Sequence, residues 1–167
     1  PIGSFQGVLS NISATELGGY AIKGAINKIN IENNLIDEVF MGNVLQANLG
    51  QAPARQAAKH AGLSDKTPCT TINKVCSSGM KAIMIGAQSI ICGDNDIVVA
   101  GGMENMSQVP HYIKEIRNGK KLGDMKIIDG LVNAGLIDVY NQSHMGVCAE
   151  KCAEEMNFSR EDQDEFA

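Results

Sequence analysis

The pattern of apolar and polar positions in the first part of the chain predicts helices and strands in alternation. Ser13-x-x-Glu16 forms a capping box, and apolar residues then recur every three to four positions, which predicts a helix of about 15 residues. The same patterns predict strands at 37–45, 67–73 and 96–102, and helices at 52–61 and 77–91. This order indicates right-handed crossovers and a mostly parallel sheet, and therefore an α/β fold with helices on both faces.

The helix predicted at 77–91 is apolar on most of its sides. Ser78, Lys81 and Gln88 form its only polar stripe. Such a helix is expected to be buried, and we expect it to need a partner surface that this chain does not contain.

The pattern of the sequence changes after residue 106. Glycines and a proline interrupt short mixed segments there, which predicts excursion loops around the core, and helical order returns at 144–156 and again after Ser159. We therefore divide the chain into an α/β core at 1–106 and the start of a loop region at 107–167.

Composition excludes several classes of protein. With 44% hydrophobic and 20% charged residues, the chain does not resemble disordered or fibrous proteins. A net charge of −5 without a large basic cluster argues against nucleic acid as a partner. We see no apolar run of roughly 18 residues, so no membrane span is expected. Five cysteines without a Cys-x-x-Cys pair indicate a reducing, intracellular compartment.

Cys76 is the sharpest candidate for chemistry, since it lies between a predicted strand end and the first turn of a predicted helix. The positive end of a helix stabilises a thiolate, and its free N–H groups can hold a thioester oxyanion. Ser77, Ser78 and Gly79 are small and leave room for a substrate. The alternative is that Cys76 only fills space, as free cysteines commonly do.

Several segments, in one order along the chain, resemble the thiolase family. The segment 73–82, Asn-Lys-Val-Cys-Ser-Ser-Gly-Met-Lys-Ala, looks like the active-site segment of thiolases, and 101–107, Gly-Gly-Met-Glu-Asn-Met-Ser, resembles the glycine-rich segment that follows it. Segments 1–5, 50–55 and 159–167 resemble further parts of the same N-terminal half. The resemblance covers nearly the whole chain and implies the layered thiolase fold.

The resemblance implies a two-step acyl transfer. Cys76 would take an acyl group from acyl-coenzyme A as a thioester, its backbone N–H contributing to an oxyanion hole, and a deprotonated acetyl-coenzyme A would then attack that thioester. Coenzyme A thioesters are substrates here, so no separate cofactor is expected.

His144 and Met145 bear on the substrate. His144-Met145-Gly146 looks like the variant found in the acetyl-coenzyme A acetyltransferases of the family, where the His and Met line the coenzyme and acetyl pocket. This favours acetyl-coenzyme A as substrate and acetoacetyl-coenzyme A as product. The alternative is an ordinary helix-start histidine, and a thiolase for longer 3-ketoacyl chains stays open.

A zinc site at His144, Cys148 and Cys152 is considered and rejected, so no metal is expected. The three residues recur every four positions, but on a helix the outer two lie about 12 Å apart and cannot share one ion.

The loop at 114–136 bears on assembly. In the resembled family the corresponding excursion helps dimers associate into tetramers, which implies a homo-oligomer, a dimer or tetramer. Its charge cluster is otherwise typical of a solvated loop, and a position near the phosphates of coenzyme A is the less favoured alternative.

The thiolase reaction also needs a Gly-His-Pro histidine and a Cys-x-Gly cysteine, and neither motif occurs in these 167 residues. We therefore expect the C-terminal thiolase domain to be absent from this chain and the chain alone to be inactive. A ketoacyl synthase and a non-catalytic subunit that binds coenzyme A are alternatives. The compartment, mitochondrial or cytoplasmic, is not resolved.

Overall fold

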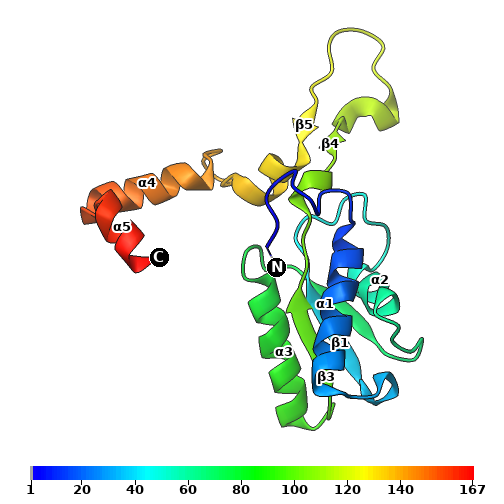
Figure 1. Cartoon of the computed structure of the whole chain (residues 1–167). Coiled ribbons are helices and arrows are strands. Elements are labelled where there is room, and N and C mark those ends of the chain that lie inside the picture. Colours follow the sequence, from blue (N-terminus) through cyan, green and yellow to red (C-terminus); the bar gives the residue numbers. More distant parts are fainter. Residues whose placement is uncertain (1) are drawn as a thin grey trace. The chain divides into compact units, whose positions relative to one another are not determined.

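The computed structural model describes residues 2–167, which divide into two compact units, one up to residue 110 and one from 111 to 167 (Figure 1). Each unit is described by itself below. The parallel sheet and the helices of the first unit confirm the α/β prediction.

The first unit is built on a three-stranded parallel sheet. The strands are β1 (Glu38–Gly42), β2 (Cys69–Ile72) and β3 (Val98–Gly102), and β1 lies in the centre. Met41 pairs with Thr71 on one side and Gly101 on the other. Because all three strands run in one direction, their carboxyl ends meet at one edge of the sheet, which is where ligands of α/β folds bind.

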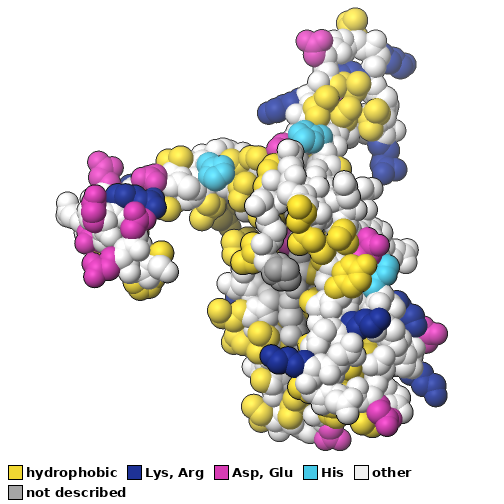
Figure 2. Space-filling model, in the orientation of Figure 1, with side chains coloured by type: hydrophobic (Ala, Val, Ile, Leu, Met, Phe, Trp, Pro, Cys, Tyr) yellow, Lys and Arg dark blue, Asp and Glu magenta, His cyan; other side chains and the backbone are white. Residues whose placement is uncertain are grey.

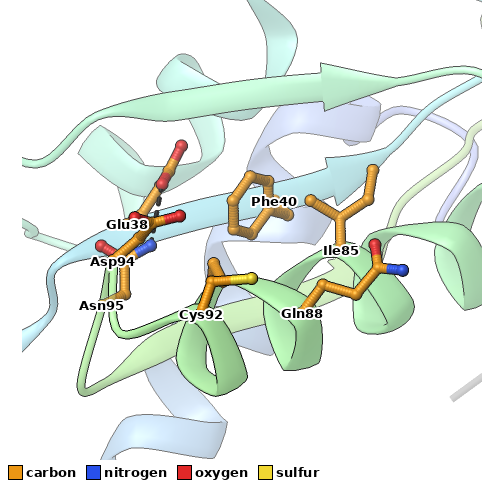
Figure 3. A pocket seen from close by; sticks show the side chains of 8 residues that line it. Glu38, Phe40, Ile85, Gln88, Cys92, Asp94 and Asn95 are labelled. Atoms are coloured by element: carbon orange, nitrogen blue, oxygen red, sulfur yellow. Dashed lines mark hydrogen bonds between the residues drawn. The ribbon is translucent and has the colours of Figure 1, made fainter.

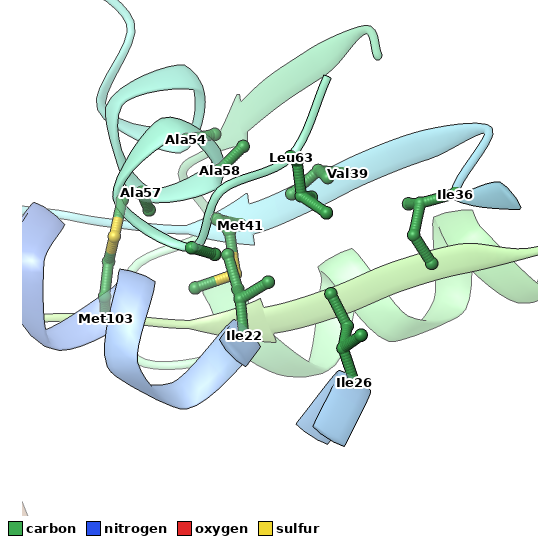
Figure 4. Packing of buried hydrophobic residues seen from close by; sticks show 11 residues of the cluster. Ile22, Ile26, Ile36, Val39, Met41, Ala54, Ala57, Ala58, Leu63 and Met103 are labelled. Carbon is green, nitrogen blue, oxygen red and sulfur yellow. The ribbon is translucent and has the colours of Figure 1, made fainter. Parts of the chain in front are cut away.

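The two faces of the sheet are covered by different helices. Val39 and Met41 point toward α1 (Ala14–Ile29) and α2 (Pro53–His60) and pack in the core with Ile22 and Leu63 (Figure 4). On the opposite face, Phe40 packs with Ile72 of β2 and Ala82 of α3 (Ser78–Cys92). Each large side chain buried in this way contributes about 1.5–3 kcal/mol relative to exposure. The alternation of β1 residues between two cores therefore fixes which side of the sheet α3 occupies.

The start of α1 is the capping box that the sequence predicts. The Glu16 N–H donates to Ser13 Oγ at 3.2 Å, and the Ser13 N–H donates to Glu16 Oε2 at 3.0 Å. The hydrogen bonds from Ser13 lower the pKa of Glu16. The helix ends at Asn30, whose φ of 54° is the left-handed conformation of a C-terminal cap.

The prediction that α3 is buried is wrong for this chain. Only Ser78, Ala82 and Gly86 of α3 are buried, and its large side chains on the side away from the sheet are exposed. In Figure 2 hydrophobic side chains gather over α3. A stripe of small residues suffices to seat the helix on the sheet, and no described residue of the first unit covers its other side. The large apolar side chains of α3 therefore form part of the exposed surface of the first unit.

The sequence expectation about membrane spans also needs a correction. The segment Val75–Cys92 is long and apolar enough to cross a membrane by length and composition, with a mean hydropathy of 1.3. Lys81 is the only charged residue in it. This is weak evidence, since core helices of soluble proteins meet the same criteria.

The second unit holds few buried side chains. Strands β4 (His111–Tyr112) and β5 (Ile128–Asp129) form an antiparallel pair around the loop predicted as an excursion, and helical turns lie at Lys114–Asn118 and Val132–Leu136. Helices α4 (Met145–Met156) and α5 (Arg160–Phe166) follow, and α5 starts at the capping box of Ser159 and Asp162.

Candidate active site

The carboxyl edge of the sheet gathers the segments that carry the candidate chemistry. Strand β1 is followed by Asn43, strand β2 by Asn73 and the turn to Cys76, and strand β3 by Met103 and Glu104. Parallel strands bring these loops together although they are about 30 residues apart in the sequence.

Cys76 lies in a tight turn directly before α3, and its side chain is exposed. The Ser77 N–H donates to the Lys74 carbonyl at 3.1 Å, and the Ser78 N–H donates to the Val75 carbonyl at 3.0 Å. The Ser78 hydroxyl closes the turn by donating to the Val75 carbonyl at 2.5 Å and accepting from the Lys74 N–H at 2.9 Å. The thiol is therefore held at the surface by a turn that hydrogen bonds close on both sides of Cys76.

Two features of this turn suit a nucleophile. No acceptor among residues 2–167 receives the backbone N–H of Cys76, Gly79 or Met80, and the N–H of Cys76 lies at the positive end of α3, a position suited to holding an oxyanion. Val75 has a φ of 48°, an uncommon conformation for a β-branched residue. Strain of this kind persists only where the surrounding contacts hold it, and it is concentrated at functional sites.

Three glycines let the start of α3 approach the sheet edge. A Cβ atom on Gly42 would lie 2.5 Å from the Gly79 nitrogen and 2.5 Å from the Ser78 carbonyl carbon. A Cβ atom on Gly102 would lie 3.3 Å from the Gly79 Cα. The sequence interpretation gave Gly79 only the role of leaving room for substrate. The glycines at the carboxyl ends of β1 and β3, Gly42 and Gly102, are the sequence feature that could have predicted this close contact between the strand ends and the backbone of α3.

Glu104 is a second residue whose role the sequence interpretation missed. Its carboxylate accepts hydrogen bonds from the Val44 N–H at 2.8 Å, the Leu45 N–H at 3.2 Å and the Asn43 side-chain amide at 2.8 Å. Burial raises the pKa of Glu104, and the three donors oppose that shift. This carboxylate therefore joins the loop after β3 to the loop after β1.

The other cysteines have different surroundings. Cys69 on β2 is half-buried, and burial raises the pKa of its thiol, which keeps it protonated and unreactive. Cys148 is also half-buried, whereas Cys92 and Cys152 are exposed, and no disulfide joins any of these residues.

His144 and Met145 lie in the second unit. His144 is the N-terminal cap of α4, where its Nδ1 accepts the Gly146 N–H at 3.0 Å, and Met145 is the first residue of that helix. Both side chains are exposed. The structure therefore gives His144 a local capping role, which is the helix-start alternative considered from the sequence.

No group of three or more His, Cys, Asp or Glu side chains within residues 2–167 is placed to hold a metal ion. A hollow next to the sheet lies at the amino end of β1, the end of the sheet opposite to Cys76. It has a volume of about 300 Å³ between α3 and the start of β1, and Glu38, Phe40 and Cys92 are among the residues that line it (Figure 3). Cys76 is not one of them, so the candidate nucleophile lies on an open surface of this unit.

Comparison with known proteins assigns the family. All of residues 1–167 match the family model described as the thiolase N-terminal domain, and the chain belongs to this family. It is 57% identical to an acetyl-CoA acetyltransferase of Candida albicans and 55% identical to acetyl-CoA acetyltransferase 2 of Arabidopsis thaliana. It is also 57% identical to a mitochondrial acetyl-CoA acetyltransferase of Danio rerio. Each alignment covers all of this chain and 42%, 41% and 39% of the respective relative. The chain thus spans about two fifths of the curated relatives it matches.

Proposed function

We propose that this chain is the nucleophile-bearing part of an acetyl-coenzyme A C-acetyltransferase, an enzyme that joins two acetyl-coenzyme A molecules into acetoacetyl-coenzyme A and coenzyme A. The observation that carries the proposal is Cys76, an exposed thiol in a constrained turn at the start of α3, beside unused backbone N–H groups. The names of relatives that are 54–57% identical over the whole chain support the same reaction.

The geometry of the turn fits the first half of the reaction. The Cys76 thiolate attacks the thioester carbonyl of acetyl-coenzyme A, the carbonyl oxygen becomes an oxyanion, and the backbone N–H of Cys76 donates to it. The carbonyl then re-forms, the bond to the coenzyme sulfur breaks, and acetyl-Cys76 remains. In the second half, the carbanion of another acetyl-coenzyme A attacks acetyl-Cys76, and the cysteine leaves as a thiolate.

The proton transfers in both halves require groups outside this chain. A base must take the Cys76 proton, and a second group must take a proton from the methyl carbon of acetyl-coenzyme A. None of the three histidines, His60, His111 and His144, lies in a Gly-His-Pro sequence, and no cysteine lies in a Cys-x-Gly sequence. We expect these 167 residues to have no turnover by themselves.

The remaining predictions belong to the same proposal. His144 and Met145 would line the coenzyme and acetyl pocket in the complete enzyme, which takes coenzyme A thioesters as substrates and needs no other cofactor. The segment 114–136 would contribute to a homo-oligomer, a dimer or tetramer. We propose an intracellular location without choosing a compartment, because one relative is named cytosolic and two are named mitochondrial.

Acid-quenched mass spectrometry of the full-length protein, after mixing with acetyl-coenzyme A, tests the proposal. An acetyl group mapped to Cys76, and lost in Cys76→Ser, is the expected result. Cys92→Ser is the matched control, since Cys92 is also exposed but lies at the other end of α3, and its adduct yield should equal that of the wild type. Absence of an adduct would overturn the enzyme assignment in favour of a non-catalytic subunit.

The preference for the length of the substrate's acyl chain is tested on the same protein. Acetoacetyl-coenzyme A should be thiolysed with a higher kcat/KM than a 3-ketoacyl-coenzyme A of longer chain. The reverse order would assign the protein to the longer-chain thiolases.

A further inference from the structure

We propose that Glu104 is a positioning residue for Cys76, because its carboxylate holds the end of β1 on which the cysteine turn rests. The inference rests on the proposed function, since it takes Cys76 as the nucleophile. Glu104 contributes no atom to the reaction and acts through the chain segments between it and Cys76.

The Glu104 carboxylate forms a clasp between two loops. Glu104 follows β3, and all three of its hydrogen-bond donors belong to the segment that follows β1. Both carboxylate oxygens are used, one by the Val44 N–H and the other by the Leu45 N–H and the Asn43 amide. Charge-assisted hydrogen bonds of this kind are short and directional. They therefore fix both the position and the orientation of three consecutive residues.

The buried Asn43 side chain makes donor contacts in this clasp while its acceptor atom stays without a partner among the described residues. Asn43 is 1% exposed, and its amide nitrogen donates both to Glu104 and to the Met103 carbonyl at 3.2 Å. Its Oδ1 atom is buried and has no hydrogen-bond partner among the described residues. A buried acceptor without a partner is rare, because it loses its hydrogen bonds to water and gains none within the protein. The two donor contacts of Asn43 with the segment that carries Glu104 are the only side-chain hydrogen bonds that Asn43 makes with the described residues.

The clasped segment contacts the Cys76 turn by two routes. The Asn73 side-chain amide donates to the Val44 carbonyl at 3.5 Å, and Asn73 Oδ1 accepts the Val75 N–H at 3.0 Å. Val75, with its positive φ, directly precedes Cys76.

The second route is steric. Gly42 directly precedes the clasped residues, and it supports the first turn of α3 so closely that no Cβ atom fits between them. A shift of residues 43–45 would therefore move the turn at both of its ends.

Glu104→Gln in the full-length protein tests this inference. Glutamine keeps the size of the side chain but presents an NH₂ group to N–H donors, so at least one hydrogen bond of the clasp is lost. The measured quantity is the rate constant for alkylation of Cys76 by iodoacetamide, divided by the folded fraction, across a range of pH. We expect this rate constant to fall by about tenfold or more, because small misplacements of a reacting group are costly. The KM for acetyl-coenzyme A should change by less than about twofold, since a positioning role acts on the reacting atom.

Glu38→Gln is the matched control. Glu38 accepts a hydrogen bond from the Asn95 amide at 3.0 Å, but it lies at the amino end of β1, away from Cys76. The rate constant for alkylation of Cys76 in Glu38→Gln should equal that of the wild type. Equal rates in Glu104→Gln and wild type, with both folded, would overturn the inference, and so would an equal slowing in Glu38→Gln.

Two further outcomes are separated by design. If Glu104→Gln does not fold, Glu104→Asp decides, because aspartate keeps the charge but its shorter side chain cannot reach all three donors; wild-type alkylation in that folded variant would overturn the inference. If the wild type forms no acetyl-Cys76, the proposed function fails, whereas the alkylation comparison still reports on Glu104. The two failures are therefore distinguishable.

Discussion

Gly42 and Gly79 are in backbone contact, so that a Cβ atom on Gly42 would lie 2.5 Å from the Gly79 nitrogen. Gly42 is the last residue of β1, and Gly79 is in the first turn of α3, three residues after Cys76. The height of the candidate nucleophile above the sheet is therefore set by the absence of a side chain at the end of the central strand.

Gly42→Ala tests that relationship. The methyl group would meet backbone atoms, which cannot rotate away, so we expect a loss of about 1–3 kcal/mol in the free energy of unfolding and slower alkylation of Cys76. Urea unfolding and the iodoacetamide rate of the full-length protein check both effects. Gly101→Ala is the control, since a Cβ atom there meets only the Met41 side chain at 3.6 Å. Equal behaviour of the two variants would show that α3 can shift without consequence.

The sequence was sufficient for the elements that depend on local patterns. The capping box at Ser13 and Glu16, the parallel order of the strands and the position of Cys76 before a helix all agree with the structure. The role of Glu104 could not be predicted, because its donors are about 60 residues away and the loops after β1 and β3 had to meet first. The burial of α3 was predicted wrongly for this chain, because an apolar helix indicates that a partner surface is needed but is buried only where that surface is present; the expectation that this chain lacks the partner surface agrees with the exposed side of α3.

Strain at Val75 gives a prediction about stability. Its φ of 48° is unfavourable for a β-branched residue, and its side chain is 55% exposed, so little packing is lost when it is removed. Val75→Gly should stabilise the full-length protein by up to about 1 kcal/mol, because relief of strain exceeds the added entropy of the unfolded chain. The same substitution at Val8, which is exposed with no positive φ, should not stabilise. A lower midpoint of urea unfolding for Val75→Gly than for the wild type would contradict the assignment of strain.

Asp37 gives a prediction about pH. Its Oδ2 accepts the Ile97 N–H at 2.8 Å and the Asp96 N–H at 2.9 Å, and these bonds lower the pKa of Asp37. Because the folded pKa lies below that of the unfolded chain, the stabilisation is present above the ordinary pKa of an aspartate and is lost as the pH falls through the folded value. Asp37→Asn should therefore cost stability near neutral pH and flatten the fall in stability below about pH 4.

Urea unfolding at a series of pH values measures the Asp37 effect. Asp94→Asn is the control, since Asp94 lies in the segment after α3 that supplies the two N–H donors, but its carboxylate accepts no hydrogen bond from the described residues. A wild-type pH dependence that Asp37→Asn leaves unaltered would show that the two backbone bonds contribute nothing to folding.

The exposed side of α3 gives a prediction about the rest of the enzyme. Ile83 is 57% exposed here, and Ile29 at the end of α1 is 64% exposed, so the two residues are equally tolerant of a charge within this chain. If the remaining part of the protein covers α3, Ile83→Glu in the full-length protein buries an unpaired carboxylate and should cost more than about 2 kcal/mol. Ile29→Glu should cost less than about 0.5 kcal/mol, as surface substitutions usually do. Thermal and urea unfolding of both variants decide the point, and equal tolerance of the two charges would mean that the apolar face of α3 stays uncovered in the whole molecule.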